Sequence, residues 1–204
     1  MIGEPQRRYG PQVGAALAFA AEVHAGQTRK GKSEPYLSHV LVVAGLVAHY
    51  GGDEEQIIAG ALHDAAEDQG GSAMLAEIRT RFGDRVADIV LDCSDALPEP
   101  GEAKPPWRVR KEAFLATLDA PDEVGSRLVE ACDKLANLRD IVEDVIAHGQ
   151  GTFERFNGKH DGTIWYYQEL GEKLIPAVPQ MQREYDRLLQ QLAGAPHDCG
   201  TAAD

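Results

Sequence analysis

Long apolar runs, paired cysteines and positive charge are all scarce in this sequence of 204 residues. No segment approaches the roughly 20 apolar residues that cross a bilayer, and residues 1–10 lack the apolar stretch of a signal peptide. Three cysteines, Cys93, Cys132 and Cys199, stand at unrelated spacings without a Cys-X-X-Cys pair. This argues against a disulfide framework and against a thiolate zinc site. We therefore expect a cytoplasmic protein that makes no membrane contact.

The charge balance is acidic, because 20 Lys and Arg against 33 Asp and Glu give a net charge of −13. A sequence-independent hold on nucleic acid needs many cations to displace counterions from phosphates, so nucleic acid is not the expected partner. A small anionic substrate remains compatible with this charge, since a local cluster or a bound cation can reverse the field inside one pocket. No pattern indicates an oligomeric state.

Hydrophobic residues at 43% and charged residues at 26% are typical of a globular chain. The length fits one domain, which we place at residues 1–193, followed by a flexible C-terminal tail at 194–204. Apolar residues recur every three or four positions and never alternate as in a strand, so the fold class is all-α. The expected helices cover residues 13–25, 36–50, 53–68, 74–81, 84–91, 107–118, 122–146, 164–175 and 180–192.

Several helix starts carry a capping signal. Asp53 followed by Gln56 has the spacing of a capping box. Asp84 is the expected cap of the helix over residues 84–91, and Pro121 or Asp122 is expected to open the longest helix.

The connections are rich in Pro and Gly. Residues 98–106 contain too much of both to be anything but an exposed loop, and residues 149–162 form a Gly-rich connection. Pro176 and Pro179 are expected to separate the last two helices.

One short segment concentrates the chemistry. Residues 61–68 read Ala-Leu-His-Asp-Ala-Ala-Glu-Asp, and the helix that begins at Asp53 is expected to carry them. Spacings of three and four residues bring Asp64, Glu67 and Asp68 to one side of a helix, where three carboxylates repel one another. A divalent cation would remove that repulsion, so the segment predicts a metal site that includes His63 and Asp64.

Two adjacent residues supply only part of a coordination shell, so ligands from elsewhere in the chain are required. His39 near the start of its helix and Asp133 on the longest helix are the best candidates. Asn137 lies one turn beyond Asp133 and can face the same pocket. For His24, at the end of the first helix, packing is the expected role.

Five motifs in this order resemble the hydrolase domain of RelA/SpoT homologues, including its small stand-alone members. They are Arg29-Lys30, residues 35–39 (Pro-Tyr-Leu-Ser-His), residues 62–68, Phe82-Gly83 and residues 133–140 (Asp-Lys-Leu-Ala-Asn-Leu-Arg-Asp). The resemblance covers roughly residues 13–175, and five ordered motifs are far more specific than one His-Asp pair. It implies an HD-domain bundle of roughly eight to ten helices.

The resemblance also implies the activity and the roles of individual residues. The expected reaction removes the 3′-pyrophosphate of ppGpp or pppGpp, giving GDP or GTP. The implied metal ligands are His39, His63, Asp64 and Asp133. The implied catalytic pair is Glu67 and Asp68, which position and activate water. The implied nucleotide-binding residues are Arg29, Lys30, Asn137 and, by a looser match, Tyr166.

The chemistry of the residues agrees with these implications. Two imidazoles and two carboxylates leave room for water and a phosphate oxygen, and their mixed hardness suits Mn²⁺ while remaining compatible with Fe²⁺ or Zn²⁺. Arg29 and Lys30 would supply the local cations that an acidic protein needs for an anionic nucleotide.

Some residues depart from the family pattern, and some alternatives remain open. Val40 stands where a proline is common and Ser94 where a threonine is usual, but neither is a proposed ligand. Asp140 matches the stand-alone hydrolases, and hydrolysis without synthesis is expected. The same site could act on an adenine alarmone or on the 2′-phosphate of NADPH. A non-catalytic nucleotide sensor is the alternative from another class, but a sensor need not keep both Glu67 and Asp68.

Overall fold

The computed structural model describes residues 9–95, 97 and 104–194. In these residues it contains ten α-helices and three short 3-10 helices, and its β structure is one isolated bridge between Thr28 and Pro35. The expected all-α class is therefore confirmed. The α-helices are α1 (Pro11–Val23), α2 (Tyr36–His49), α3 (Glu54–Leu62), α4 (Ala65–Gln69), α5 (Gly71–Phe82), α6 (Asp84–Cys93), α7 (Trp107–Thr117), α8 (Ser126–His148), α9 (Lys159–Lys173) and α10 (Gln182–Ala193). The 3-10 helices are η1 (Gln150–Arg155), η2 (Ile175–Ala177) and η3 (Pro179–Met181).

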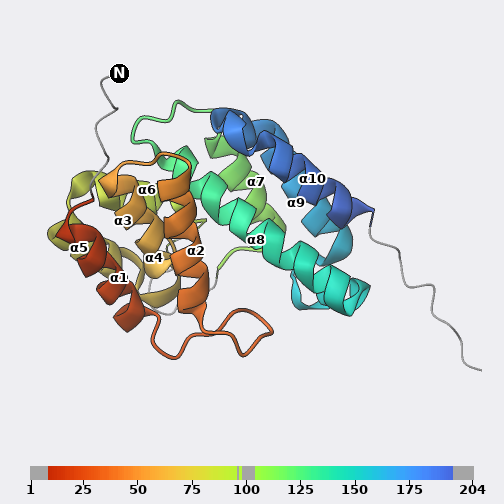
Figure 1. The fold of residues 1–204 in the computed structure, drawn as a ribbon, viewed down its shortest axis with the longest axis horizontal. Coiled ribbons are helices and arrows are strands. Elements are labelled where there is room, and N and C mark those ends of the chain that lie inside the picture. The colour runs from red at the N-terminus through yellow and green to blue at the C-terminus, as the bar shows by residue number, and fades with distance from the viewer. Residues whose placement is uncertain (1–8, 96, 98–103, 195–204) are drawn as a thin grey trace, which may run out of the picture.

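The helices form two groups with α2 and α8 between them (Figure 1). Helices α1 and α3 to α6 lie at one end of the molecule, and α7, α9 and α10 lie at the other. Helix α8 is the longest, at 23 residues, and it packs against α2, α3, α6 and α10. Thirteen of its 23 residues are buried, among them the continuous run 129–133, as a helix covered on several sides requires. Side chains on α8 can therefore meet side chains from either group.

Helices α2 and α3 approach each other closely at Gly60. A Cβ at Gly60 would lie 3.1 Å from Cγ2 of Val47 and 3.5 Å from Cα of Ala44. A side chain at this position would press on Val47, since such a contact is tighter than ordinary van der Waals distance. The close approach brings the side chains of α2 next to the C-terminal end of α3.

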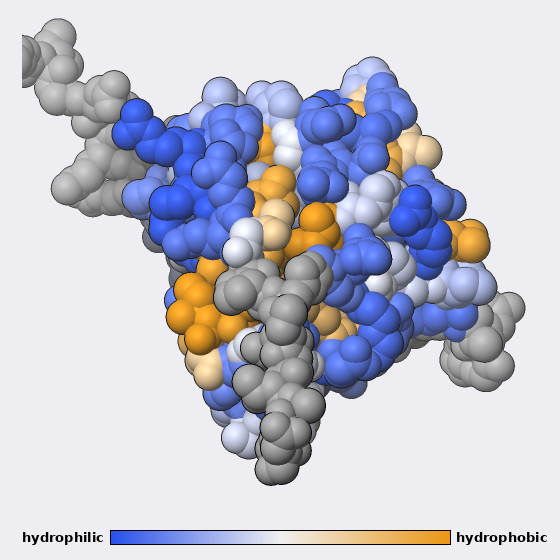
Figure 2. Space-filling view, turned by 90° about the vertical axis from the view of Figure 1, so that its right-hand side faces the viewer, coloured by the Kyte–Doolittle hydropathy of each residue, from blue (hydrophilic) through white to orange (hydrophobic). Residues whose placement is uncertain are grey.

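Apolar side chains fill the interior between the helices. Figure 2 shows one face on which hydrophilic residues predominate, with smaller apolar patches between them. None of the described helices combines the length and the apolar character that a bilayer crossing needs.

Most expected helices are present, and α6 begins at Asp84 as expected, but the expected capping role of Asp84 and the expected helix start at Pro121 or Asp122 are wrong. Helix α6 is capped by Gly83, whose φ of +96° ends the preceding helix, and the Asp84 carboxylate accepts a hydrogen bond from Arg79 instead. Helix α8 begins only at Ser126, because Gly125 adopts a left-handed conformation with φ +84°. Asp122 lies outside the helix and accepts from the backbone amides of Gly125 and Ser126, at 2.8 Å each. The capping box of Asp53 and Gln56 is confirmed.

The expected Gly-rich connection over residues 149–162 is also wrong in part. Helix η1 occupies its first half, and α9 begins at Lys159 and includes Gly162. The ring of Trp107 explains this, because a Cβ at Gly158 would lie 2.7 Å from it and one at Gly162 would lie 3.2 Å away. Both glycines leave room for the indole of Trp107. Residues 98–103 of the expected exposed loop and residues 195–204 of the expected tail lie outside the described residues.

Candidate metal centre and active-site cavity

His63 and Asp64 lie at a break between two helices, not on one continuous helix as expected. Helix α3 ends at Leu62 with His63 as its C-cap, and α4 begins after Asp64. On an unbroken helix, adjacent side chains point about 100° apart. The break gives Asp64 φ −97° and ψ −3°, and both side chains of the pair face the same point.

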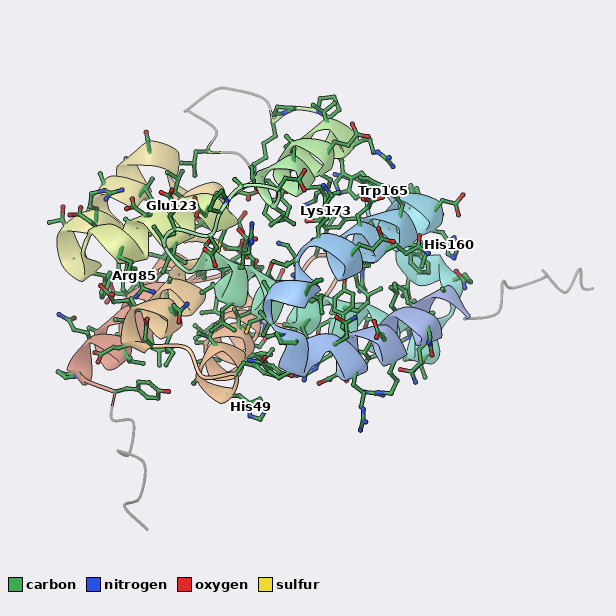
Figure 3. The ribbon with its side chains drawn as sticks, turned by 90° about the horizontal axis from the view of Figure 1, so that it is seen from above. His49, Arg85, Glu123, His160, Trp165 and Lys173 are labelled. Carbon is green, nitrogen blue, oxygen red and sulfur yellow. The ribbon has the colours of Figure 1, made fainter. Side chains whose placement is uncertain are left out.

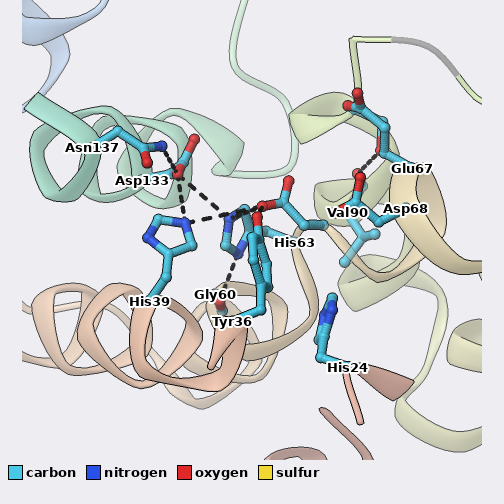
Figure 4. Close-up of polar contacts among 12 residues, drawn as sticks. His24, Tyr36, His39, Gly60, His63, Glu67, Asp68, Val90, Asp133 and Asn137 are labelled. Carbon is cyan, nitrogen blue, oxygen red and sulfur yellow. Dashed lines mark hydrogen bonds and ion pairs between the residues drawn. The ribbon is translucent and has the colours of Figure 1, made fainter. Parts of the chain in front are cut away.

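Four side chains from three parts of the chain converge at this break, and Figure 4 labels three of them, His39, His63 and Asp133. One ligand atom from each of His39, His63, Asp64 and Asp133 lies within 4.8 Å of the others. His39 comes from α2 and Asp133 from α8, so the packing of these helices on α3 assembles the group. The structure thus brings together the four residues that the sequence named as metal ligands.

The donor atoms fit a shared cation better than they fit hydrogen bonds. Nε2 of His39 lies 3.1 Å from Oδ1 of Asp133, and Nε2 of His63 lies 2.9 Å from Oδ2 of Asp64. Neither buried Nε2 atom has an aligned hydrogen-bond partner. Nδ1 of His63 lies 2.9 Å from the carbonyl oxygen of Gly60, which can only accept. That contact leaves Nδ1 as the donor and directs Nε2 at the cluster, as metal-binding histidines are held.

Strong opposite charges surround the two carboxylates. Burial would raise the pKa of Asp133, but the ammonium of Lys134, whose Nζ lies 2.7 Å from Oδ2, outweighs burial and holds that pKa well below its usual range. Burial likewise opposes ionisation of Asp64, and the neighbouring His63 outweighs it and lowers the pKa of Asp64. Both carboxylates are therefore ionised at neutral pH and can act as ligands.

A cavity of about 430 Å³ opens beside this cluster. Tyr36 and Asn137 line it, and each contacts one of the cluster carboxylates: the Tyr36 hydroxyl donates to Asp64, and Nδ2 of Asn137 donates to Asp133 at 2.6 Å. The charged lining residues are seven cations, Arg29, Lys30, Lys32, Arg110, Lys111, Lys134 and Arg155, and four anions, Glu67, Asp68, Asp95 and Asp140. The cavity is thus cationic on balance, the reverse of the chain as a whole.

All four residues expected to bind nucleotide line this cavity. Arg29 is held by two hydrogen bonds, at 2.7 Å to Oδ1 of Asn137 and 2.8 Å to Oδ2 of Asp140. Tyr166 is 5% exposed, and its hydroxyl has no hydrogen-bond partner among the described residues. Lys30 is exposed at the rim. Lys32, from the same basic loop, pairs with Asp144 at 2.7 Å.

Glu67 and Asp68 lie on α4 and also line the cavity. Glu67 is held firmly, because the backbone amide of Asp95 donates to its Oε2 at 3.0 Å and Lys104 lies 2.9 Å from its Oε1. Asp68 accepts one hydrogen bond, at 2.8 Å, from Nε2 of Gln27. Asp68 is exposed at the cavity rim, where the surrounding protein, followed by the charge of Asp64, raises its pKa.

The sequence reasoning missed a chain of contacts behind Asp68. Nδ1 of His24 lies 2.8 Å from Oε1 of Gln27, the residue that donates to Asp68. The His24 ring also lies 5.0 Å, centroid to centroid, from the ring of Tyr36. His24 is therefore more than the helix-end packing that we expected. The three-residue spacing from His24 to Gln27 was visible in the sequence, but its link to Asp68, 41 residues beyond Gln27, was not.

The sequence reasoning also missed the cations that α7 and α8 add to the cavity. Arg110 and Lys111 both contact Oδ2 of Asp95, and Lys134 follows the candidate ligand Asp133. No local pattern marks Arg110 and Lys111, because their place at the cavity depends on where α7 packs. Only the position of Lys134, next to a candidate ligand, could have signalled its role.

The sequence and the fold are both similar to those of known proteins. Residues 16–162 match the family model described as HD domain. The chain is 29% identical over 199 residues to the guanosine-3′,5′-bis(diphosphate) 3′-pyrophosphohydrolase of Aquifex aeolicus, an alignment that covers 90% of this chain and 28% of the relative. It is 37% identical over 129 residues to the guanosine-3′,5′-bis(diphosphate) 3′-pyrophosphohydrolase MESH1 of Xenopus tropicalis, covering 62% of this chain and 67% of that protein.

Among solved structures, the fold is similar to that of a metazoan ortholog of SpoT, described as hydrolysing ppGpp. The TM-score is 0.72 at 22% sequence identity, and the match covers 91% of this chain and 97% of the other. At that identity the likeness concerns the fold alone. The chain thus spans about a quarter of the length of the Aquifex relative but nearly all of the small SpoT ortholog.

Proposed function

Because the chain belongs to the HD domain family, we propose that it is a metal-dependent hydrolase that removes the 3′-pyrophosphate of ppGpp or pppGpp. The products would be pyrophosphate and GDP or GTP. One observation carries the proposal: four convergent metal-ligand atoms stand beside a cavity in which seven cations outnumber four anions. The printed activity of the Aquifex and Xenopus relatives supports this choice of substrate.

The proposed metal ligands are His39, His63, Asp64 and Asp133. Two nitrogen and two oxygen donors suit Mn²⁺, with Fe²⁺ and Zn²⁺ as alternatives. When bound, a divalent cation would supply positive charge beside the phosphoryl oxygens and increase the acidity of a nearby water. Asn137 and Lys134, which donate to the two oxygens of Asp133, keep that carboxylate oriented.

Glu67 and Asp68 are the proposed catalytic pair. The two contacts to Glu67 fix its carboxylate, which suits it to orienting the attacking water. The raised pKa of Asp68 makes its carboxylate a better proton acceptor than an ordinary aspartate. We propose that Asp68 accepts the proton of that water and that Glu67 orients the water.

The cationic residues of the cavity are the proposed binding site for the phosphates. Arg29 and Lys30 from the basic loop would contact the nucleotide from one side, while Arg110 and Lys111 face it from α7. Asn137 positions Arg29, and the buried hydroxyl of Tyr166 offers a hydrogen bond. Cations in a partly enclosed cavity bind phosphate more strongly than the same groups in open water.

The substrate is tested by incubating the purified chain and Mn²⁺ separately with ppGpp, ppApp and NADPH and identifying the products. Release of pyrophosphate from ppGpp alone is expected. Turnover of ppApp or NADPH alone would keep the hydrolase but change its substrate. Binding of ppGpp without turnover of any of the three would mean that the protein is a nucleotide sensor.

A further inference from the structure

A second cavity, of about 330 Å³, lies between the end of α6, α7 and the start of α8. Helix α7 packs chiefly against α9, where Arg108 covers the Trp165 ring and Lys173 pairs with Asp119 just beyond α7. Figure 3 shows Trp165 and Lys173 beside α7, and Glu123 on the segment that leads to α8. Because α7 packs on α9, a space remains between α7 and the helices α6 and α8. This space is separate from the active-site cavity except for Asp95, which lines both.

A buried carboxyl group with one unpartnered oxygen forms part of the wall. Glu130 on α8 is 3% exposed, and its Oε2 has no hydrogen-bond partner among the described residues. Oδ1 of Asp95 is also buried and unpartnered. Burying an unsatisfied carboxylate oxygen is unfavourable, so each such atom indicates a missing donor. Burial raises the pKa of Glu130 to about 8, so without a donor beside it this side chain keeps its proton at neutral pH.

Acidic side chains outnumber basic ones around the cavity, although Asp95 pairs with Arg110 and Lys111 on its other side. Its lining contains four acidic residues, Asp92, Asp95, Asp122 and Glu130, and a single basic one, Arg127. Arg127 donates hydrogen bonds to the backbone oxygens of Leu118 and Ala120. Lys134, the basic residue that most stabilises the charge of Glu130, pairs with Asp133 instead. Asp92 and Asp122 are exposed and lie at the mouth of the cavity, while Glu130 is buried in its interior.

The spacing and the walls favour an organic cation over a metal ion. The single group of close His, Cys, Asp and Glu ligand atoms in the described chain is the one at His63, so these acidic residues do not converge on one point. Apolar side chains, including Phe114, Leu118 and Pro121, line the space between them. A ligand with two ammonium groups joined by methylenes would fit this arrangement. Its ammonium groups would contact the separated carboxylates, and its methylenes would contact the apolar walls.

We propose that this cavity binds an alkyl diamine or polyamine, with one ammonium group on Glu130 and a second on Asp92 and Asp122 at the mouth. The inner ammonium supplies the donors that the buried oxygen lacks. Its arrival favours the ionised carboxylate, so Glu130 releases its proton when the amine binds. This site does not depend on the proposed hydrolase activity.

The test is calorimetric titration of the purified full chain with 1,4-diaminobutane and with spermidine at pH 7. The titration is done in two buffers that differ in ionisation enthalpy. We expect saturable binding at one site, weaker binding of 1-aminobutane, and a heat that depends on the buffer because a proton is released. Glu130→Gln should lower the affinity at least tenfold and remove the buffer dependence, while metal content and hydrolysis stay unchanged. Glu143→Gln, an exposed change of equal charge on the same helix, should leave binding intact.

Three outcomes would overturn the proposal. They are no saturable binding of any diamine, equal affinity in wild type and Glu130→Gln, and displacement of the diamine by Mg²⁺ at equal concentration, which would indicate a metal site. If Glu130→Gln does not fold, Asp92→Asn at the exposed mouth replaces it. That variant should weaken the diamines but not 1-aminobutane, and unchanged diamine affinity would also overturn the proposal.

Discussion

Gln27 donates a hydrogen bond of 2.8 Å from its Nε2 to Oδ2 of Asp68, and its own Oε1 lies 2.8 Å from Nδ1 of His24. The amide therefore has a fixed direction, because the imidazole occupies its oxygen side and the carboxylate its nitrogen side. His24 and Gln27 thus hold a proposed catalytic carboxylate in place.

Removing that amide should slow the reaction without removing the metal. For Gln27→Leu we expect kcat to fall about tenfold, a typical loss for a misplaced proton acceptor, while KM and metal content stay unchanged. Without the donor, the pKa of Asp68 should rise further, which moves the acidic limb of the kcat–pH profile to higher pH. Gln182→Leu removes a similar 2.8 Å bond to Asp186 on α10 and serves as control. A loss of metal in Gln27→Leu would contradict this role.

The cluster and the carboxylates of α4 should separate into two functions. Asp64→Ala is expected to lose both bound metal and hydrolysis, because Asp64 offers an atom within 4.8 Å of the other three ligands. Glu67→Gln should keep the metal and lose about 100-fold in kcat, since a general catalytic group contributes on that scale. Metal content by elemental analysis and the rate of pyrophosphate release measure the two effects. A metal-free Glu67→Gln protein would refute this division of roles.

Arg29 should act on substrate binding more than on chemistry. Arg29→Met removes a charged hydrogen-bond donor from the cavity, and we expect KM for the nucleotide to rise roughly tenfold or more, with kcat changed less. Arg139→Met is the matched control, because Arg139 forms two hydrogen bonds to Glu184, at 2.8 and 2.9 Å, on another face of α8. Steady-state kinetics of both variants measure the difference, and an equal rise in KM would show a general loss of structure instead.

The metal cluster was predictable because its members are marked by local patterns. His63-Asp64 is an adjacent pair, and Asp133 heads a motif with Asn137 one turn further on. The sequence also predicted most helices, since their apolar spacing is regular. The break after Leu62 was not predictable, because every residue from Ala61 to Ala66 is compatible with a helix and only the convergence on a shared point requires the break.

The features that the sequence did not reveal depend on tertiary packing. Gly125 sets the start of α8 through its left-handed conformation, which no pattern of apolar residues records. Arg110 and Lys111 reach the active-site cavity because α7 packs on α9, with Trp107 against Gly158. These contacts join residues about 50 positions apart, and periodicity carries no information at that distance.

Glu130 should make the folded protein less stable as pH rises. Its pKa rises from an ordinary 4.5 to about 8 on folding, so between these values the folded chain holds a proton that the unfolded chain has released. The stabilising contribution of protonated Glu130 is therefore fully present below pH 4.5. It is lost as the pH rises through 8, by at most about 1.4 kcal/mol per pH unit. Urea unfolding at pH 5, 6.5 and 8, without added amine, should show this loss in wild type and Glu143→Gln but not in Glu130→Gln. Parallel curves for all three would contradict it.

The contact at Gly60 should link the stability of the fold to the metal site. In Gly60→Ala the new methyl would lie 3.1 Å from Cγ2 of Val47, and overpacking of this kind costs about 1–3 kcal/mol. The shift would also move the carbonyl that lies 2.9 Å from Nδ1 of His63, so metal affinity should fall together with the melting temperature. Gly45→Ala on the exposed side of α2 meets nothing within 4 Å and should raise stability by about 0.5–1 kcal/mol, with metal affinity unchanged. Thermal unfolding and metal titration of the two variants test the link, which fails if Gly60→Ala is destabilised but binds metal as wild type does.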